Sequence, residues 1–349
     1  MSSSIKIIGL MSGTSVDGLD ICCVSFNKNN PSVYSIINCE TVNYNDQLKN
    51  ELINIINFDE QKINELDIKL GKFIGESVLT FIQKNKLKKI DLISSHGHTV
   101  YHQPSIGKTL QIGNGQTIYN LTNIKTVNNF REQDVKFGGQ GAPLVPIGDK
   151  ILFSEYKYCL NLGGFANISI KNDNIYAYDI CPLNTVLNYY SKKIGFEFDI
   201  DGKLSKKGNI NVSLFDDLNK IIYYHEIHPK SLGIEFVNEK IFPLIDEYNL
   251  NENDVLATFI KHVSYQISKN IDGKEKVHIT GGGSFNKSLI KSLKDDYNIN
   301  LLVPEDKIIN YKEALIFALL GYLKINNKIN CLKSVTGASK NHSSGDIYF

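Results

Sequence analysis

The sequence predicts an α/β protein built from two similar halves. A strand, a glycine turn, a second strand, a polar turn and a third strand begin near residue 5, and the same series begins again near residue 156. Apolar residues at three- and four-residue spacing follow each series and indicate helices. A separation of roughly 150 residues is too long for a solenoid repeat but suits a duplicated domain. Two such halves favour a cleft between them, where binding sites commonly form.

In the first half, four strands and one long helix are expected. The opening strands are expected at Ile5–Leu10, Leu19–Phe26 and Val33–Val42. Apolar residues recur at helical spacing across 63–78. The strand Ile90–Ser94 follows and leads into a histidine-containing segment.

The second half repeats this pattern and ends in helices. Its opening strands are expected at Tyr156–Leu162, Asn167–Ile170 and Ile175–Ile180. Helical spacing returns across 255–267, and the strand Val277–Thr280 leads into a triple-glycine turn. The remaining helices are expected near Asn286–Leu293 and at Tyr311–Leu323.

Composition excludes several functional classes. The 349 residues are enough for two domains with separate cores. The formal net charge is +1, and no basic stripe indicates nucleic acid. No apolar run is long enough to span a bilayer, so we expect no membrane partner. The segment Met1–Lys6 lacks the apolar region of a signal peptide, which favours a cytoplasmic protein.

Potential metal ligands form no recognisable set. Three histidines, His96, His98 and His102, lie close together in the chain, but no cysteine or carboxylate set completes a zinc site with them. The cysteines contain no CxxC pair, and reduced core thiols are favoured over disulfides or metal ligands. The six cysteines are Cys22, Cys23, Cys39, Cys159, Cys181 and Cys331.

The most informative segment is the turn between the first two strands. Residues 9–20 combine three glycines, three hydroxyl side chains and two aspartates. Exposed N–H groups and hydroxyls in such a turn can hold phosphate oxygens, and Asp17 could organise a divalent cation through water. The segment lacks the ending of a Walker A loop and the helix that follows a dinucleotide fingerprint. An ordinary glycine-rich hairpin is the alternative.

This segment resembles the signature of the anhydro-N-acetylmuramic acid kinases, which belong to the sugar kinase, Hsp70 and actin superfamily. Further matches to that family occur in order along nearly the whole chain, and together they are far more specific than any one alone. The matching segments are His96–Val100 with His102 and Pro104, Thr109–Gly115, Phe130–Asp134, Gly138–Pro146, Leu160–Ser169, Pro229–Phe236, Gly281–Gly283 and Ser334–Ala338.

The resemblance implies duplicated actin-like ATPase domains, of the ribonuclease H-like type, with an ATP and sugar cleft between them. We expect one domain at 1–132 plus 325–349 and the other at 133–324. Family members use ATP and water to open the ring of 1,6-anhydro-N-acetylmuramic acid and phosphorylate O6, giving N-acetylmuramic acid 6-phosphate. They act in peptidoglycan recycling in the cytoplasm, usually as homodimers.

Asp179 is the candidate general base. The reaction needs a carboxylate or histidine within reach of the attacking water, and Asp179 stands at the end of a predicted strand. The family's base occupies the matching position, whereas a turn-capping aspartate is the alternative. The family motif is altered after it, because residues 180–184 read Ile-Cys-Pro-Leu-Asn without the usual glycines and threonine. This change makes the exact sugar uncertain.

The resemblance also implies residues that contact the sugar. They are His96, His98, Arg131, Asn184 and Glu313. The planar guanidinium of Arg131 suits bidentate pairing with the lactyl carboxylate of a muramic sugar, although a salt bridge to Asp134 or Glu132 is equally plausible. Glu313 could instead be a helix N-terminal acid stabilised by the helix dipole. Asn129 and His98 stand where the family usually has aspartate and glutamine.

Three glycine turns are assigned to the nucleotide by the same resemblance. The turn Gly163-Gly164 resembles the second phosphate loop and Gly281-Gly282-Gly283 the adenosine-side turn. Phosphoryl transfer requires Mg²⁺, and Asp17 is the candidate nearest to it. The first phosphate loop comprises Gly13, Thr14, Ser15, Val16, Asp17, Gly18, Leu19 and Asp20.

Two other functions remain open from the sequence. A related branch of the family phosphorylates levoglucosan, which lacks the lactyl group and would leave Arg131 without that partner. A non-catalytic ATP- and sugar-binding regulator is the other alternative, since the turn after Asp179 is altered and Asn129 replaces an acid.

Overall fold

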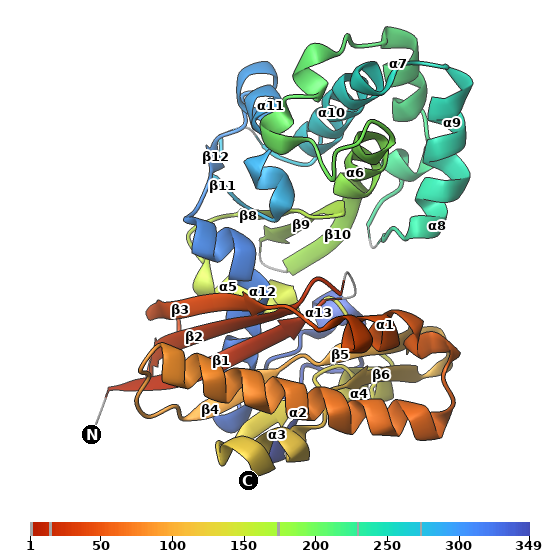
Figure 1. Ribbon diagram of the computed structural model, residues 1–349. Helices are drawn as coiled ribbons and strands as arrows, with labels where there is room; N and C mark the ends of the chain where they lie inside the picture. The colour runs from red at the N-terminus through yellow and green to blue at the C-terminus, as the bar shows by residue number, and fades with distance from the viewer. Residues whose placement is uncertain (1–2, 14–15, 173–174, 229, 273) are drawn as a thin grey trace. The chain divides into compact units, whose positions relative to one another are not determined.

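A six-stranded sheet with order β13-β7-β4-β1-β2-β3 forms the core of the first half (Figure 1). It belongs to a computed structural model that describes all residues except 1–2, 14–15, 173–174, 229 and 273. Strands β1, β2 and β3 form an antiparallel meander, and β4 and β7 run parallel to β1. The bounds are β1 Ser4–Ser12, β2 Leu19–Asn27, β3 Tyr34–Val42, β4 Leu92–Ser95, β7 Thr126–Asn128 and β13 Asp346–Tyr348, with a separate hairpin of β5 His98–Gln103 and β6 Lys108–Ile112.

The second half contains a five-stranded sheet with order β10-β9-β8-β11-β12. Its first three strands are again an antiparallel meander, and β11 and β12 are parallel to β8. The bounds are β8 Tyr158–Leu162, β9 Phe165–Lys171, β10 Ile175–Pro182, β11 Val277–Thr280 and β12 Leu301–Leu302. The predicted strands are therefore present, with ends that differ by a few residues.

The two sheets share one topology. When the strands of each sheet are numbered in chain order, the first five lie side by side in the order 3-2-1-4-5. The antiparallel pairs need only turns, whereas each parallel pair needs a long crossover connection. This arrangement is the ribonuclease H-like one, so the predicted duplication of an actin-like domain is confirmed.

Helices cover the first sheet. The long helix α2 (Glu60–Lys84) is capped at its N-terminus by Asp59, whose side chain accepts a hydrogen bond from the Lys62 N–H. Its buried residues recur every three or four positions and share one apolar core with β1, β2 and β4. The helix α12 (Asp306–Ile325) passes so close to Gly9 in β1 that a Cβ there would meet its backbone. The other helices are α1 Asp46–Asn54, α3 Gly115–Thr122, α4 Glu132–Lys136, α5 Val145–Leu152 and α13 Lys333–Thr336.

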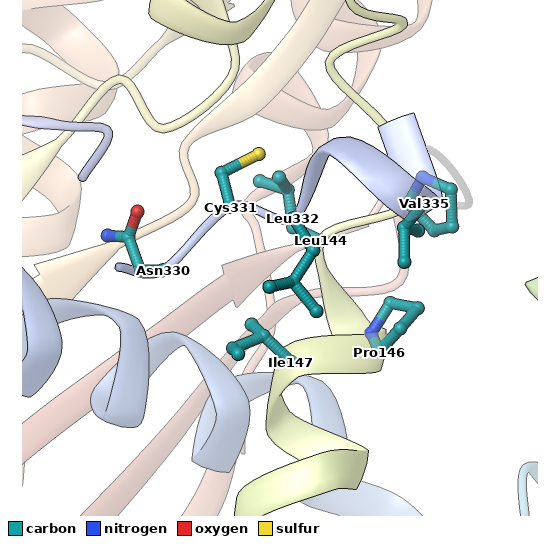
Figure 2. A pocket seen from close by; sticks show the side chains of 8 residues that line it. Leu144, Pro146, Ile147, Asn330, Cys331, Leu332 and Val335 are labelled. Carbon is teal, nitrogen blue, oxygen red and sulfur yellow. The ribbon is translucent and has the colours of Figure 1, made fainter. Parts of the chain in front are cut away.

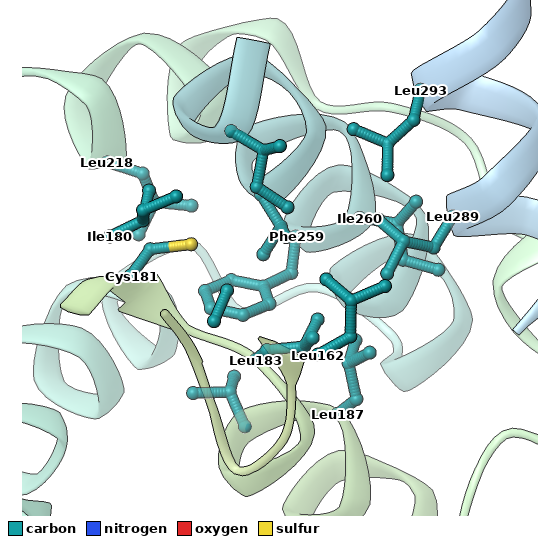
Figure 3. Packing of buried hydrophobic residues seen from close by; sticks show 14 of the residues in the cluster. Leu162, Ile180, Cys181, Leu183, Leu187, Leu218, Phe259, Ile260, Leu289 and Leu293 are labelled. Carbon is teal, nitrogen blue, oxygen red and sulfur yellow. The ribbon is translucent and has the colours of Figure 1, made fainter. Parts of the chain in front are cut away.

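The second sheet supports the larger apolar core (Figure 3). The helix α10 (Glu252–Ser268) is buried on most of its surface and packs with β10 and with α6 and α7. Figure 3 shows Phe259 of this helix among apolar side chains that include Leu162, Cys181 and Leu183. The helices of this half are α6 Asn184–Lys193, α7 Val212–Asn219, α8 Ile234–Phe236, α9 Phe242–Glu247, α10 and α11 Lys287–Lys291.

The chain divides into two compact units, which we call unit 1 (Met1–Leu152 with Tyr311–Phe349) and unit 2 (Phe153–Asn310). The predicted boundaries at 132/133 and 324/325 differ from these. The reason is the packing of α5 with α12, where Asp149 and Lys312 form a buried 2.8 Å ion pair. The second boundary falls at Tyr311, whose backbone is not helical (φ −120°, ψ 18°), so α12 kinks there.

The cysteines agree with the expectation of reduced thiols. The six cysteines are present as thiols, and the Sγ atoms of Cys22 and Cys39 lie 3.1 Å apart on paired strands. Among the described helices, none combines the length and apolar character that a membrane crossing requires.

His262 gives unit 2 a specific sensitivity to acid. Its ring is fully buried in α10, where Nδ1 lies 2.8 Å from Asn219 Oδ1, and burial lowers its pKa to about 3. The unfolded chain, with a histidine pKa near 6.5, takes up the proton first, so stability is lost as the pH falls below about 6.5. This residue alone should cost about 2 kcal/mol of unfolding free energy by pH 5.

Denaturant unfolding at pH 7.5 and pH 5 checks this expectation. His262→Phe keeps an aromatic ring but removes the titration, so its loss of stability between the two pH values should be smaller than that of the parent by the same amount. An identical loss in both proteins would rule out His262 as the cause.

Candidate active site

Asp179 lies at an irregularity in β10. The pairing of β10 with β9 shifts register between Asp179 and Cys181, and such a bulge changes the direction of a side chain. The Asp179 Oδ2 atom accepts a 2.9 Å hydrogen bond from the Leu232 N–H, and its carbonyl accepts one from the Tyr223 hydroxyl at 2.7 Å. Burial raises the pKa of this carboxyl, and the Leu232 bond lowers it in part. The site therefore holds a half-buried carboxylate in a fixed orientation.

The alternative role of Asp179 as a turn cap is not supported. The helix that follows, α6, has Leu183 at its N-cap position and no side-chain capping bond. The carboxylate instead holds the segment around Leu232, which belongs to a family-like motif whose role the sequence did not indicate. The presence of that motif was the available signal, but only the fold brings it beside β10.

The altered residues after Asp179 point into the core. Ile180, Cys181 and Leu183 are at most 2% exposed and contact the apolar cluster of unit 2 (Figure 3). Asn184 donates through Nδ2 to the Leu162 carbonyl at 3.0 Å. Asn184, expected to contact sugar, thus fixes the turn that contains Gly163 and Gly164.

The two glycine turns of unit 2 meet at one edge of the sheet. Thr280 in β11 pairs with Asn161 in β8, so the turns after both parallel strands are neighbours. Gly281 has φ +84°, and a Cβ there would lie 2.7 Å from Asn161 Oδ1 and from the Leu162 backbone. A Cβ on Gly282 would come no nearer than 3.9 Å to Asn184. Gly281 is thus required by packing, whereas Gly282 borders open space.

In unit 1, the turn between β1 and β2 presents backbone and carboxylates. Thr14 and Ser15, two predicted phosphate contacts, lie outside the described residues. Val16 has φ +54° and is buried, as is Leu19, so both contribute backbone rather than side chains to any ligand site. Gly13 accepts the Val16 N–H at 3.1 Å, and Gly18 allows close approach of β3.

The acids of this turn fit a divalent cation. The Asp17 side chain is exposed, and Asp20 accepts a 2.6 Å hydrogen bond from the Thr41 hydroxyl. Burial chiefly raises the pKa of Asp20, and the charge of Asp17 adds to the shift. Two neighbouring carboxylates, one of them exposed, are oxygen donors of the kind that Mg²⁺ takes directly or through water.

Arg131 is held by unit 1 without the predicted salt bridges. Its Nε donates to His96 Nε2 at 3.0 Å, and Nη1 donates to the Gly141 carbonyl at 2.8 Å. Burial lowers the pKa of the guanidinium, and the Glu313 carboxylate opposes that shift. The described structure pairs Glu132 with Lys136 instead.

The two predicted histidines are engaged in structural contacts. His96 Nδ1 bonds the Gly97 carbonyl at 2.8 Å while Nε2 accepts from Arg131, so the ring is neutral. Burial, and then the Arg131 charge, hold its pKa well below the usual range. His98 Nδ1 lies 3.1 Å from the Ser12 hydroxyl, at the start of the first glycine turn. Burial also lowers the pKa of His98.

Two further positions bear on the sequence alternatives. Asn129, where the family usually has aspartate, donates to both Glu132 and Asp346 at 2.6 and 2.8 Å. An aspartate at position 129 would bring a third carboxylate beside these two and would be repelled by them. The contacts of Asn129 therefore account for the amide. Glu313 follows the kink at Tyr311 and lies in the first turn of the resumed helix, so its alternative role as a helix-terminal acid stays open.

Comparison with known proteins identifies the family. Residues 5–349 match the family model described as anhydro-N-acetylmuramic acid kinase. Proteins of that name from Haemophilus influenzae, Sulfurimonas denitrificans and Francisella tularensis subsp. novicida are 33%, 30% and 32% identical to this chain. The alignments cover 98%, 98% and 100% of this chain and 97%, 98% and 100% of those proteins. The chain therefore belongs to the anhydro-N-acetylmuramic acid kinase family of enzymes.

Proposed function

We propose that this chain phosphorylates 1,6-anhydro-N-acetylmuramic acid at O6, with hydrolytic opening of its anhydro ring, and releases N-acetylmuramic acid 6-phosphate. The observation that carries the proposal is the oriented, half-buried carboxylate of Asp179, whose raised pKa favours proton uptake. Asp179 would accept a proton from water as the water attacks the anomeric carbon. The bond from that carbon to O6 then breaks, and O6 takes the terminal phosphoryl group of ATP.

The nucleotide contacts are proposed from the three glycine turns. The β1–β2 turn would bind phosphate oxygens through backbone N–H groups, and the turns at Gly163-Gly164 and Gly281–Gly283 share one sheet edge in unit 2. Asp17 and Asp20 would hold Mg²⁺, which neutralises charge on the transferring phosphoryl group. We further propose a homodimer acting in cytoplasmic peptidoglycan recycling, in line with the family.

One incubation tests the proposed reaction. The protein, Mg-ATP and either anhydro-N-acetylmuramic acid or levoglucosan are incubated in ¹⁸O-labelled water, and products are analysed by mass spectrometry. The expected product gains phosphate plus water, with the label on the anomeric oxygen. Turnover of levoglucosan alone would favour the second sugar class. ATP binding without turnover of either sugar would favour a regulator.

Gly281→Ala and Gly282→Ala should separate folding from nucleotide binding. The first places a Cβ at positive φ against Asn161 and Leu162, which should cost about 1–3 kcal/mol of stability. The second meets little protein, so the fold should keep its melting temperature while the KM for ATP rises. Thermal unfolding and steady-state kinetics on both variants check this. Equal destabilisation by the two alanines would contradict the open space assigned beside Gly282.

A further inference from the structure

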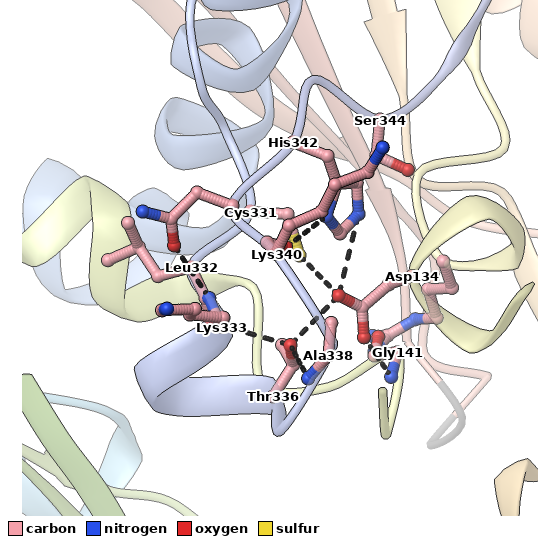
Figure 4. Close-up of polar contacts among 12 residues, drawn as sticks. Asp134, Gly141, Cys331, Leu332, Lys333, Thr336, Ala338, Lys340, His342 and Ser344 are labelled. Carbon is pink, nitrogen blue, oxygen red and sulfur yellow. Dashed lines mark hydrogen bonds and ion pairs between the residues drawn. The ribbon is translucent and has the colours of Figure 1, made fainter. Parts of the chain in front are cut away.

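A second cluster of chemically active side chains lies in unit 1, outside the contacts assigned to sugar or nucleotide. It joins Asp134 of α4 to Cys331 and His342, which flank α13 in the C-terminal segment (Figure 4). Cys331 and His342 exchange both backbone N–H to carbonyl hydrogen bonds, at 3.1 and 3.2 Å. This antiparallel bridge holds the two side chains beside each other. All three residues are buried.

The potential ligand atoms converge on Asp134 Oδ1. Cys331 Sγ lies 3.0 Å from this oxygen and His342 Nε2 lies 3.4 Å from it, and all three atoms are within 4.8 Å of one another. The other carboxylate oxygen, Oδ2, accepts the Gly141 N–H at 2.7 Å. This bond fixes the orientation of the carboxylate, as second-shell contacts do around metal ligands.

His342 has a nitrogen aimed into the cluster that makes no hydrogen bond with the described residues. Its Nδ1 lies 3.1 Å from the Lys340 carbonyl and would donate to it. In the neutral ring this bond leaves Nε2 unprotonated, with its lone pair facing Asp134 Oδ1. The Nε2 atom is buried and has no hydrogen-bond partner among the described residues. Two facing acceptors repel each other unless a proton or a cation lies between them. Donation of Nδ1–H to a backbone carbonyl is also the arrangement that metal-ligating histidines adopt.

We propose that Asp134, Cys331 and His342 bind a divalent transition-metal ion, of which zinc fits the donor set best. Oxygen, thiolate sulfur and imidazole nitrogen together are typical of zinc sites. One carboxylate and one thiolate would neutralise the dipositive ion, so the buried cluster carries no net charge. The Thr336 hydroxyl, 2.8 Å from Asp134 Oδ1, or a water would supply the fourth donor.

Binding would exchange a proton for the metal. Without metal, the Cys331 Sγ lies 3.0 Å from Asp134 Oδ1, so the protonated thiol donates to the carboxylate. The metal replaces that proton, which leaves to solvent. A small pocket borders Cys331 (Figure 2). Its apolar lining includes Leu144, Ile147 and Val335.

The bound metal would have a structural role and would take no part in phosphoryl transfer. It ties α4 to the segment 331–342. Asp134 also anchors Gly141, whose carbonyl accepts from Arg131. Metal binding should therefore stabilise unit 1 and the loop behind Arg131 without entering the phosphoryl transfer.

Cobalt substitution of the metal-free full chain tests the proposal. We expect one Co²⁺ per chain, a sulfur-to-cobalt charge-transfer band in the near ultraviolet, a melting temperature raised by several degrees, and displacement of the band by Zn²⁺. Cys331→Ser should lose the band, whereas Cys39→Ser, a thiol in another part of unit 1, should keep it. His342→Gln should weaken binding at least tenfold.

Two results would contradict the proposed metal site. Absence of the band in the parent protein, or a band of unchanged intensity in a folded Cys331→Ser variant, would exclude it. The parent spectrum alone is decisive if Cys331→Ser fails to fold. Because the readout is spectroscopic, this result is independent of whether the chain phosphorylates the proposed sugar.

Discussion

Asp179→Asn should lower kcat by about 10²- to 10⁴-fold, the usual contribution of a positioned general base. The amide oxygen can still accept the Leu232 N–H, so the orientation of the residue is kept while its basicity is lost. Because burial raises the pKa of Asp179, the folded state favours the protonated carboxyl, and its stabilising effect is lost as the pH rises through that pKa. Replacing the charge should leave the melting temperature at pH 7.5 unchanged or higher.

Steady-state kinetics and thermal unfolding on the same preparation measure both quantities. The matched control is Asp216→Asn, an exposed carboxylate in α7 of the same unit, which should retain activity. The parent's kcat/KM should fall on the acid side at a pH above the ordinary aspartate pKa of about 3.9, because the base must be ionised to accept a proton. Full activity in Asp179→Asn would remove this residue from the base role.

Arg131→Lys should raise the KM for anhydro-N-acetylmuramic acid about 10- to 100-fold. Lysine keeps the charge but cannot present two parallel N–H groups to a carboxylate, and a charge-assisted hydrogen bond contributes about 1.5–3 kcal/mol. It also cannot donate simultaneously to His96 and Gly141 as the guanidinium does. The variant should therefore show a modest fall in melting temperature as well.

Measurements with levoglucosan distinguish a direct contact between Arg131 and the lactyl carboxylate from a purely structural role of Arg131. It carries no lactyl carboxylate, so a direct contact predicts that Arg131→Lys changes its KM much less than that of the muramic sugar. A structural role of Arg131 alone would raise both KM values equally, and that result would contradict the assignment to the lactyl group.

The fold was largely predictable because its signals are local. Alternating and helical apolar spacing depend on neighbouring residues, and the meander repeats itself with the same turns. The unit boundaries were harder to predict, because they depend on the packing of α5 against α12, including the ion pair between Asp149 and Lys312. Residues this far apart in the chain leave no periodic signal.

The candidate site shows the same contrast between local sequence signals and contacts that only the fold creates. The positions of Asp179, Arg131 and the glycine turns came from motifs, but their partners came from the fold. The Leu232 N–H, the Gly141 carbonyl and the His96 ring contact them through long chain separations. The Asp134, Cys331 and His342 cluster was missed entirely, because its members have no short metal-binding spacing.

The division of unit 1 between the two ends of the sequence determines an order of folding during synthesis. Unit 2 is one continuous segment and can close as soon as residue 310 has emerged. The strand β1 must wait for α12, which lies against Gly9, and β7 must wait for β13. We therefore expect the half that is made first to finish folding last, with its apolar strands open to chaperones until α12 and β13 have been made.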